Sequence, residues 1–521
     1  MTRRLFILFL FITIPLYNVK PAAAFYSEPV FFTQEGDYFL HTVEQGQTVY
    51  SIARMYNVQE EAVYRLNPGS RESIQTGAQL KIPQESGSYF YHTIQPKETL
   101  YSVSRMYQMK GEDIVNANPG LSIETFSYGK VIRIPTNRVT TPMTGPSEDS
   151  IRKSTNALLS ASDPPENIPA IRMALLLPFA ANASMVARMV EYYEGFLLAL
   201  EDIKKQGISV VLQVYDIGEK TDRLPSILKK PEMRQVDIIF GGLSEKQIRM
   251  IANFSREWNI PYVIPFNSRS DEPMTYATVY QISTPPSYMY SKASSAFCDR
   301  YRDATIVFHV PSASGNRMDF IQVVQKDLKA KNIPYQVLTD EEITSSDVLT
   351  LLSETKNTVF VPSDDGPDAL SKMVVPLRVA LDLNPQMLVS LFGYPAWQAS
   401  GTDYLSDLFR FNATFFSVYY ANVTSAKYKT FYNNYIHWYS KELINVYPKF
   451  GLLGYDTGMF FIQALNRYGS ALAPNIDQLN YSGIQMDFNF ERVNNWGGFI
   501  NTNLYLVDFR SDGTITSHAI K

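Results

Sequence analysis

Residues 38–83 read YFLHTVEQGQTVYSIARMYNVQEEAVYRLNPGSRESIQTGAQLKIP, and residues 89–135 read YFYHTIQPKETLYSVSRMYQMKGEDIVNANPGLSIETFSYGKVIRIP. Over residues 38–69, 14 of the 32 positions are identical to the residue 51 places further along the chain. Identity at a fixed shift indicates an internal duplication. Each copy predicts one small unit: an alternating strand, a polar turn, two short helices, a loop with Asn-Pro-Gly, and a closing strand that stops at proline.

The first helix of each copy has the clearest pattern. Thr48 is a residue type that caps helices, and apolar residues follow it at helical spacing: Val49, Ile52, Ala53 and Tyr56. The second copy repeats this pattern after Thr99. Because Tyr56 and its counterpart Tyr107 fall on the apolar face, we predict that they belong to the core and do not contact a ligand.

A βααβ unit of this kind resembles the LysM domain, a family that binds N-acetylglucosamine glycans such as peptidoglycan and chitin. Residues 46–53, 67–69 and 77–83 carry the resemblance in family order. We therefore expect LysM repeats at residues 38–84 and 89–136. The family's aspartate before the capping threonine is Gln47 in the first copy and Glu98 in the second, and its turn glycine is Lys97 in the second. These departures predict weaker glycan binding by the second copy.

The resemblance implies that two loops of each repeat hold the glycan, largely through backbone groups. In the first repeat the expected glycan-binding residues are Gly46, Gln47, Thr48, Val49, Asn67, Pro68 and Ile74. In the second they are Lys97, Glu98, Thr99, Leu100, Asn118 and Pro119. Short loops beside a helix start offer amides and small apolar contacts, which suit a neutral amino sugar. The alternative is that the repeats are structural spacers that bind no glycan.

Residues 1–24 have the features of a secretory signal peptide. Arg3 and Arg4 precede an apolar run over residues 5–16, and three alanines at 22–24 form a small-residue cleavage site. The run is too short to span a bilayer, although an uncleaved anchor is the alternative. No cysteine stands directly after the run, which excludes a lipoprotein anchor. We expect an exported, cell-wall-associated protein, periplasmic in location, with no integral membrane segment after cleavage.

The composition argues against two further classes of protein. Removal of the signal takes away three basic residues and no acidic one, so the net charge goes from −4 to −7. A mildly acidic chain gives no reason to expect nucleic acid as a partner. Cys298 is the only cysteine, so an intramolecular disulfide is excluded. Its helical, apolar surroundings predict a core thiol.

Residues 137–169 are rich in Thr, Pro, Ser, Asn and Asp, which predicts a flexible linker with a short helical turn near residues 151–160. Beyond it, apolar strands alternate with amphipathic helices. Strands are expected at 171–177, 210–215, 236–240, 262–265, 305–309, 358–361 and 387–392, and helices at 245–258, 318–330 and 366–381. This alternation predicts an α/β fold with two mostly parallel sheets covered by helices.

Short phrases in residues 171–178, 192–200, 214–216, 236–242, 260–265 and 454–456 follow one another as in type I periplasmic binding proteins of the amino-acid-receptor type. The resemblance implies a bilobal domain at 170–521. Ligands bind such folds outside the carboxyl ends of the strands. The candidate small-ligand cleft residues are Ser244, Asn267, Ser268, Ser283 and Tyr394.

Polar side chains of this kind would suit a zwitterionic solute, although loops at the surface are polar in any protein. Amino-acid receptors of this class commonly carry a serine or threonine run in their first loop. Here that loop reads Phe179-Ala180-Ala181. The departure argues against a simple transfer of the receptor function to this chain.

The sequence contains no catalytic or metal-binding motif that we could identify. The five histidines lack the HExxH spacing, and neither a Gly-x-Ser-x-Gly turn nor a phosphate-binding loop is present. We therefore expect no enzymatic activity, no cofactor and no metal.

The combination of signal peptide, LysM repeats and receptor-like module resembles exported wall-associated proteins of Bacteroidetes. Some wall proteins use this bilobal fold as a protein-interaction platform, as do outer-membrane activators of penicillin-binding proteins. We expect a non-catalytic peptidoglycan-binding protein whose bilobal module recruits or regulates an envelope protein, such as a wall synthase or hydrolase. The alternative is a wall-tethered receptor for amino acids or small peptides.

Overall fold

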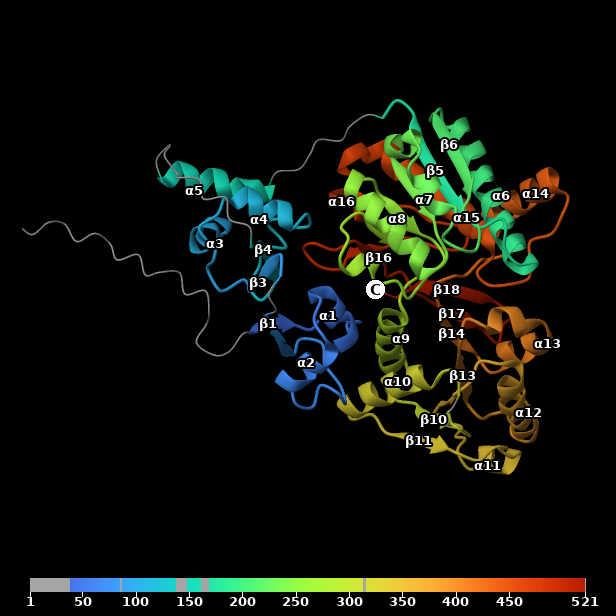
Figure 1. Cartoon of the computed structure of the whole chain (residues 1–521). Coiled ribbons are helices and arrows are strands. Elements are labelled where there is room, and N and C mark those ends of the chain that lie inside the picture. The colour runs from blue at the N-terminus through green and yellow to red at the C-terminus, as the bar shows by residue number, and fades with distance from the viewer. Residues whose placement is uncertain (1–37, 85–86, 137–147, 161–167, 313–314, 521) are drawn as a thin grey trace, which may run out of the picture.

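The computed structural model describes residues 38–84, 87–136, 148–160, 168–312 and 315–520. Two small βααβ repeats lie beside a large module with two lobes (Figure 1). The large module contains two mostly parallel sheets, so the predicted fold class is confirmed. The expected signal peptide, residues 1–24, lies outside the described residues.

Each repeat is a two-stranded antiparallel sheet covered by two helices. The first repeat contains β1 (Tyr38–Thr42), α1 (Val49–Tyr56), α2 (Glu60–Leu66) and β2 (Gln79–Pro83). The second contains β3 (Tyr89–Thr93), α3 (Leu100–Met106), α4 (Gly111–Ala117) and β4 (Val131–Pro135). Thr48 and Thr99 cap α1 and α3 through capping boxes with Ser51 and Ser102, as the sequence pattern predicted.

Part of the expected linker is a helix that packs on the second repeat. Residues Glu148–Ala157 form α5, and a short 3-10 turn, η1 (Leu158–Ser160), follows. The N–H of Tyr101 donates to Asn156 Oδ1 at 3.0 Å, and the Tyr101 hydroxyl donates to Glu148 at 2.9 Å. Leu158 joins the apolar core of the repeat. The helix and the 3-10 turn together cover residues 148–160, so the helical segment begins before the region 151–160 in which a short turn was expected.

The first lobe of the large module is built on a seven-stranded sheet in the order β15-β16-β9-β8-β7-β5-β6. Its strands are β5 (Ile171–Leu177), β6 (Val210–Asp216), β7 (Ile238–Gly241), β8 (Tyr262–Ile264), β9 (Val279–Gln281), β15 (Phe490–Arg492) and β16 (Phe499–Asn501). Its helices are α6 (Ala183–Lys205), α7 (Leu224–Leu228), α8 (Glu245–Trp258), α14 (Ala426–Tyr439), α15 (Phe450–Tyr468) and α16 (Leu472–Asn475), with the 3-10 turns η2 (Pro231–Gln235), η3 (Glu272–Met274), η4 (Gly469–Ala471) and η5 (Ile476–Gln478).

The second lobe has a seven-stranded sheet in the order β11-β10-β12-β13-β14-β17-β18. Its strands are β10 (Thr305–His309), β11 (Tyr335–Leu338), β12 (Thr358–Pro362), β13 (Val389–Gly393), β14 (Thr414–Ser417), β17 (Tyr505–Phe509) and β18 (Ile515–Ala519). Its helices are α9 (Pro286–Arg300), α10 (Met318–Ala330), α11 (Ser345–Leu349), α12 (Pro367–Leu383) and α13 (Trp397–Arg410). The pairs β15–β16, β14–β17 and β17–β18 are antiparallel, and the other pairs in both lobes are parallel.

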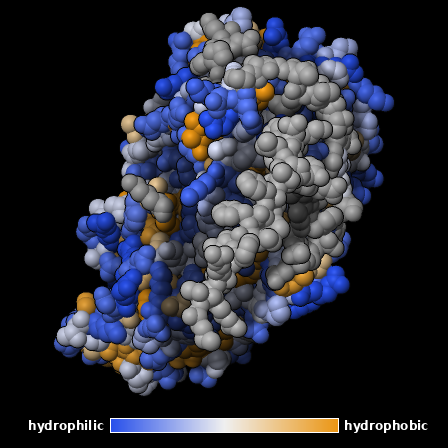
Figure 2. Space-filling view, turned by 90° about the vertical axis from the view of Figure 1, so that its left-hand side faces the viewer, coloured by the Kyte–Doolittle hydropathy of each residue, from blue (hydrophilic) through white to orange (hydrophobic). Residues whose placement is uncertain are grey.

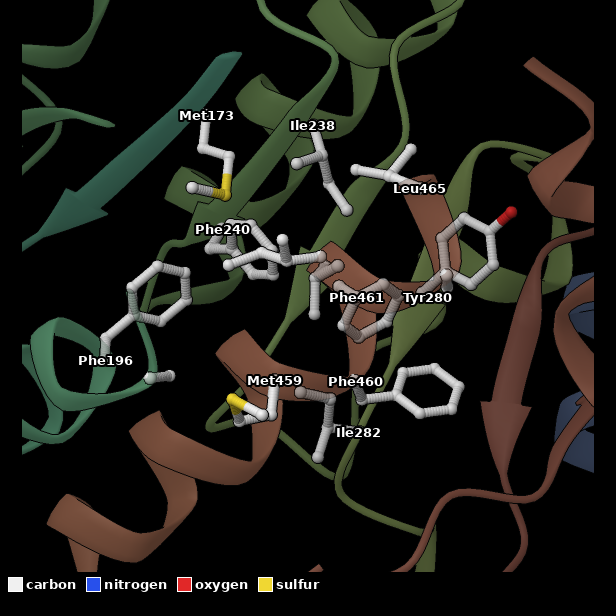
Figure 3. Packing of buried hydrophobic residues seen from close by; sticks show 14 of the residues in the cluster. Met173, Phe196, Ile238, Phe240, Tyr280, Ile282, Met459, Phe460, Phe461 and Leu465 are labelled. Atoms are coloured by element: carbon white, nitrogen blue, oxygen red, sulfur yellow. The ribbon is translucent and has the colours of Figure 1, made fainter. Parts of the chain in front are cut away.

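The first lobe has a buried cluster on each face of its sheet, one against helices α6 and α15 and the other against α7 and α8. In Figure 3, Phe196 of α6, Phe240 of β7 and Phe461 of α15 pack against one another. The ring centroids of Phe196 and Phe240 are 5.2 Å apart, and those of Phe240 and Phe461 are 5.7 Å apart, both edge-on. Aromatic pairs of this geometry add to the energy of burial. The chain passes between the lobes after β9, β14 and β16, and we call these passages the hinge.

Candidate functional site

The second repeat exposes parts of its two expected glycan loops, although Gly120 of the second loop donates its N–H to the Asn495 carbonyl of the first lobe at 2.8 Å. Lys97 and Thr99 of the first loop are exposed. In the second loop, Ile123 is 60% exposed and Tyr128 is 65% exposed. Figure 2 views the face of the molecule that carries the repeats, where the visible surface is mostly hydrophilic with scattered hydrophobic patches. An exposed apolar side chain beside polar loop groups can cover the apolar face of a sugar ring.

The first repeat does not leave its loops open in the same way. Its first loop touches α9 of the second lobe at Gly46, where an added Cβ would lie 2.9 Å from the Tyr288 Cα atom. Its second loop touches α10, because Lys326 Nζ donates to the Ile74 carbonyl at 2.7 Å. Val49 is buried in its repeat, as is its counterpart Leu100, so this position does not distinguish the two repeats. The two repeats therefore have similar folds but different access to their loops, which the sequence did not indicate.

Gln47 and Glu98 point into their repeats. His41 Nε2 lies 2.8 Å from Gln47 Oε1, and His41 Nδ1 lies 2.7 Å from the Tyr56 hydroxyl. Burial lowers the pKa of His41, so the neutral ring accepts from Tyr56 at Nδ1 and donates to Gln47 at Nε2. Gln47 also accepts the N–H of Glu44, which closes the turn.

The second repeat reproduces this arrangement with His92. Its Nδ1 lies 3.0 Å from the Tyr107 hydroxyl and its Nε2 lies 2.7 Å from Glu98 Oε2. Glu98 also accepts the N–H of Gln95 at 2.8 Å. The side chains expected to contact glycan at 47 and 98 thus hold the turn from inside. Tyr56 is fully buried and Tyr107 half-buried, in line with their expected place in the core.

Asn67 and Asn118 also form hydrogen bonds within their own repeats. The Asn118 amide donates to the Ile114 and Arg133 carbonyls and accepts the Arg133 N–H, at 2.7–2.8 Å. Asn67 makes the equivalent bonds to Val63 and Lys81 at 2.8 Å. Leu100 is buried in the core, whereas Pro68 and Pro119 are exposed. The asparagines therefore fix the second loop of each repeat, and both N–H donors of each side-chain amide are used within the repeat.

Lys97 occupies a backbone conformation that favours glycine. Its φ is 69°, and Gly46, its counterpart in the first repeat, has a φ of 81°. A residue with a Cβ loses roughly 1–2 kcal/mol in this left-handed region. We expect Lys97→Gly to raise the free energy of unfolding by about 0.5–1 kcal/mol, measured by urea denaturation. Lys97→Ala keeps the Cβ, so an equal gain from that variant would contradict the explanation.

The first repeat is also fixed to the first lobe. The Tyr50 hydroxyl donates to Asp271 at 2.6 Å, and Arg54 Nε donates to the same carboxylate at 3.1 Å. Asp271 precedes η3 in the sequence. The sequence could have indicated this contact. Tyr50 and Arg54 are repeated as Tyr101 and Arg105, although they lie on the side of the helix that faces away from the core of the repeat. The equivalent Tyr101 binds Glu148 of α5, so each repeat uses this tyrosine for docking.

Trp496, in the turn between β15 and β16, lies between the two repeats. Its ring centroid is 5.7 Å from that of Tyr56 in the first repeat and 5.6 Å from that of Tyr91 in the second. The Arg133 guanidinium of the second repeat lies 4.6 Å from the Trp496 ring centroid. A cavity of about 260 Å³ lies at this junction, lined by parts of both repeats and by residues 492–496.

A cleft of about 400 Å³ separates the two lobes. Of the five expected cleft residues, Ser268 and Ser283 line it. Ser244 is exposed and caps α8, and Asn267 accepts the N–H of Arg269 at 2.7 Å within its own loop. Tyr394 is fully buried and donates to the Pro362 carbonyl at 2.5 Å. Ser244, Asn267 and Tyr394 therefore do not line this cleft, because they cap a helix, close a turn and pack in the core, respectively.

The polar groups in and near the cleft already have partners in the protein. The Ser283 hydroxyl lies 2.9 Å from the Tyr419 hydroxyl and 3.2 Å from the Pro265 carbonyl. Arg317, which also lines the cleft, forms an ion pair with Asp365. In the loop after β5, the N–H groups of Phe179 and Ala180 donate to Asp216 at 3.0 and 3.2 Å. A zwitterionic ligand would have to compete with these internal partners.

The described residues place no group of three or more His, Cys, Asp or Glu side chains where they could hold a metal ion. Cys298 lies buried on α9, and burial raises the pKa of its thiol to about 11. A thiol with so high a pKa is a poor nucleophile at neutral pH. Within the described ranges, no helix combines the length and the apolar character needed to cross a membrane.

Comparison with known families agrees with the geometry of the repeats. The family profile described as LysM domain matches residues 41–83 and 92–135. The chain contains two LysM repeats. LysM domains imply binding to peptidoglycan or other N-acetylglucosamine glycans, and this implication applies to the two repeats alone.

One curated protein similar to the chain is described as a sporulation-specific glycosylase, YdhD of Bacillus subtilis (strain 168). It is 30% identical over 97 residues, which are 19% of this chain and 22% of that protein. The chain thus matches about a fifth of that relative's length. A likeness over so short a part does not extend the glycosylase activity to this chain.

Solved structures resemble the two-lobed module. A protein described as a branched-chain amino acid ABC transporter from Rhodospirillum rubrum matches 67% of this chain and 100% of its own, with a TM-score of 0.50 and 14% identity. A ligand-binding protein of a branched-chain amino acid ABC transporter from Burkholderia xenovorans LB400 covers 67% and 94%, with a TM-score of 0.43 and 14% identity. The module therefore has the fold of type I periplasmic binding proteins, and likeness at this level of identity shows the fold alone.

Proposed function

We propose that this protein is a non-catalytic periplasmic protein that binds peptidoglycan through its second LysM repeat. The observation that carries the proposal is the difference in access. In the second repeat Lys97, Thr99 and Ile123 are exposed although Gly120 contacts the first lobe, whereas both loops of the first repeat touch the second lobe. This ranking reverses the expectation from the sequence, which favoured the first repeat. That expectation rested on the residues at positions 47, 97 and 98, and the side chains of Gln47 and Glu98 point inward.

We further propose that the two-lobed module recruits or regulates an envelope protein, such as a wall synthase or hydrolase. The interlobe cleft supports this role over that of an amino-acid receptor, because its Ser283 and Arg317 groups already have internal partners. The volume of the cleft supports the receptor alternative, because it is large enough for a small solute. Crosslinking in intact cells that captures a synthase or hydrolase supports recruitment, and a solute retained by the purified protein in native mass spectrometry supports the receptor.

Sedimentation with purified wall sacculi tests the glycan site. We expect Ile123→Asp to weaken binding at least about tenfold, because the variant replaces an exposed apolar contact in the second loop with a charge. The measurement is the fraction of full-length protein that pellets as the amount of sacculi is varied. Soluble chitotetraose should compete with the sacculi for the wild-type protein.

Met106→Asp is the matched control. Met106 is 42% exposed and belongs to the same repeat, but it lies at the last residue of α3, away from the loops that precede and face the start of that helix. We expect this variant to pellet like the wild type. Equal losses in Ile123→Asp and Met106→Asp would show that the loops of the second repeat are not the binding site.

A further inference from the structure

We propose that the first LysM repeat is a brace across the hinge of the two-lobed module, and that a glycan entering its loops displaces the second lobe. Wall binding and lobe position would then be coupled through one small domain. The inference rests on the proposed function, since it takes the ligand of the first repeat to be the same N-acetylglucosamine polymer that the second repeat binds.

The first repeat makes extensive contacts with the first lobe. Met55 and Tyr56 share one buried apolar cluster with Met274, Val493 and Trp496 of the first lobe. Tyr50 and Arg54 add two hydrogen bonds to Asp271. Because this shared core is closely packed, we expect the first repeat and the first lobe to move together as one body.

The contacts of the first repeat with the second lobe are fewer, and its glycan loops make them. Tyr288, which packs against Gly46, belongs to the first turn of α9, directly after the hinge passage that follows β9. Lys326, which donates to the Ile74 carbonyl, lies further from the hinge, on α10. The first repeat thus touches both lobes, and α1 lies close to α9 in Figure 1. A rotation of the second lobe about the hinge would change both of these contacts.

A sugar cannot occupy the space between the loops of the first repeat while α9 and α10 contact them. Two partners that compete for one surface weaken each other to the same extent, so glycan would favour a displaced second lobe and a displaced lobe would favour glycan. Coupling between sites commonly changes affinity by about 5- to 150-fold. Release of the first repeat would also add a second binding site, with avidity for a polymer of about 10²- to 10⁴-fold.

The test is a calorimetric titration of the full-length protein with chitotetraose. The release variant combines Tyr288→Ala with Lys326→Ala, which removes the ring on Gly46 and the donor to Ile74. In a titration range set by the affinity of the second repeat, we expect one binding site per chain in the wild type, because the second lobe weakens the first repeat, and two in the release variant. The matched control is Lys329→Ala on the same helix, an exposed lysine that we expect to leave one site. Thermal unfolding of each variant verifies that it is folded, and Lys326→Glu serves if the double variant is not.

A distance measurement checks the coupling in the opposite direction. Spin labels at Lys204→Cys on α6 and Lys372→Cys on α12 report the separation of the two lobes, and both positions are exposed while Cys298 is buried. Chitotetraose raised well above the range of the titration, so that it also occupies the weakened first repeat, should broaden or shift this distance distribution in the otherwise wild-type chain. The distribution of the release variant should be broad or shifted before any sugar is added.

The outcomes separate the brace from the proposed function. One site in a folded release variant, with no change in lobe distance, would show that the second lobe does not mask the first repeat, while wall binding by the second repeat stands. Two sites in the wild type would overturn the brace in the same way. Absence of chitotetraose binding in every protein would instead refute the proposed function, and the brace with it.

Discussion

Trp496→Ala is expected to lower the free energy of unfolding by about 3–5 kcal/mol and to loosen both repeats from the two-lobed module. Trp496 is 2% exposed and fills the junction of three parts of the chain, so truncation leaves a large cavity there. It also removes the ring that lies against Tyr56, Tyr91 and Arg133. Urea unfolding measures the loss of stability, and small-angle X-ray scattering should show a larger radius of gyration.

Trp258→Ala is the matched control for this prediction. Trp258 is 39% exposed at the end of α8, and its ring also has an arginine above it, with Arg234 at 4.5 Å from the centroid. An exposed cation–π pair contributes about 0.5–1 kcal/mol. We therefore expect a small loss of stability and an unchanged radius of gyration. If the two tryptophan variants behaved alike, Trp496 would not be the residue that joins the repeats to the module.

Gly195→Ala is expected to destabilise the first lobe by about 3 kcal/mol or more. An added Cβ at Gly195 on α6 would lie 1.8 Å from the Gly451 carbonyl oxygen on α15. At Gly454 on α15 it would lie 2.0 Å from the Tyr192 carbonyl oxygen on α6. Both neighbours are backbone atoms of a helix, so relief requires that the two helices separate and open the core between them. Gly454→Ala should have the same effect for the same reason.

Thermal unfolding measures this effect, and Gly87→Ala supplies the control. Gly87 lies in the segment between the repeats, where an added Cβ meets no atom within 4 Å. Alanine there is expected to leave the melting temperature unchanged or slightly higher, because it restricts the unfolded chain. A wild-type melting temperature for Gly195→Ala would mean that α6 and α15 pack less closely than in the structure.

Local patterns in the sequence predicted many elements to the residue. Helix α8 over 245–258, helix α10 over 318–330 and strand β5 over 171–177 begin and end where their apolar periodicity predicted. The C-terminal strands β15 to β18 were not predicted. They are short, and three of the pairs that they form are antiparallel additions to the edges of otherwise parallel sheets. They fall outside the alternation of strands and helices that located the parallel strands, so that pattern did not mark them.

The sequence by itself determined that a motif is duplicated, that each copy folds as a LysM repeat, and that an α/β module follows. These conclusions depend on spacing within a few dozen residues, where apolar periodicity, capping and turn residues act. Tertiary structure alone decided which loops of each repeat contact the two-lobed module. That choice depends on pairs such as Gly46 with Tyr288 and Ile74 with Lys326, which are more than 200 residues apart in the chain. No local pattern encodes such a contact, because the folded path of the whole chain brings its two sides together.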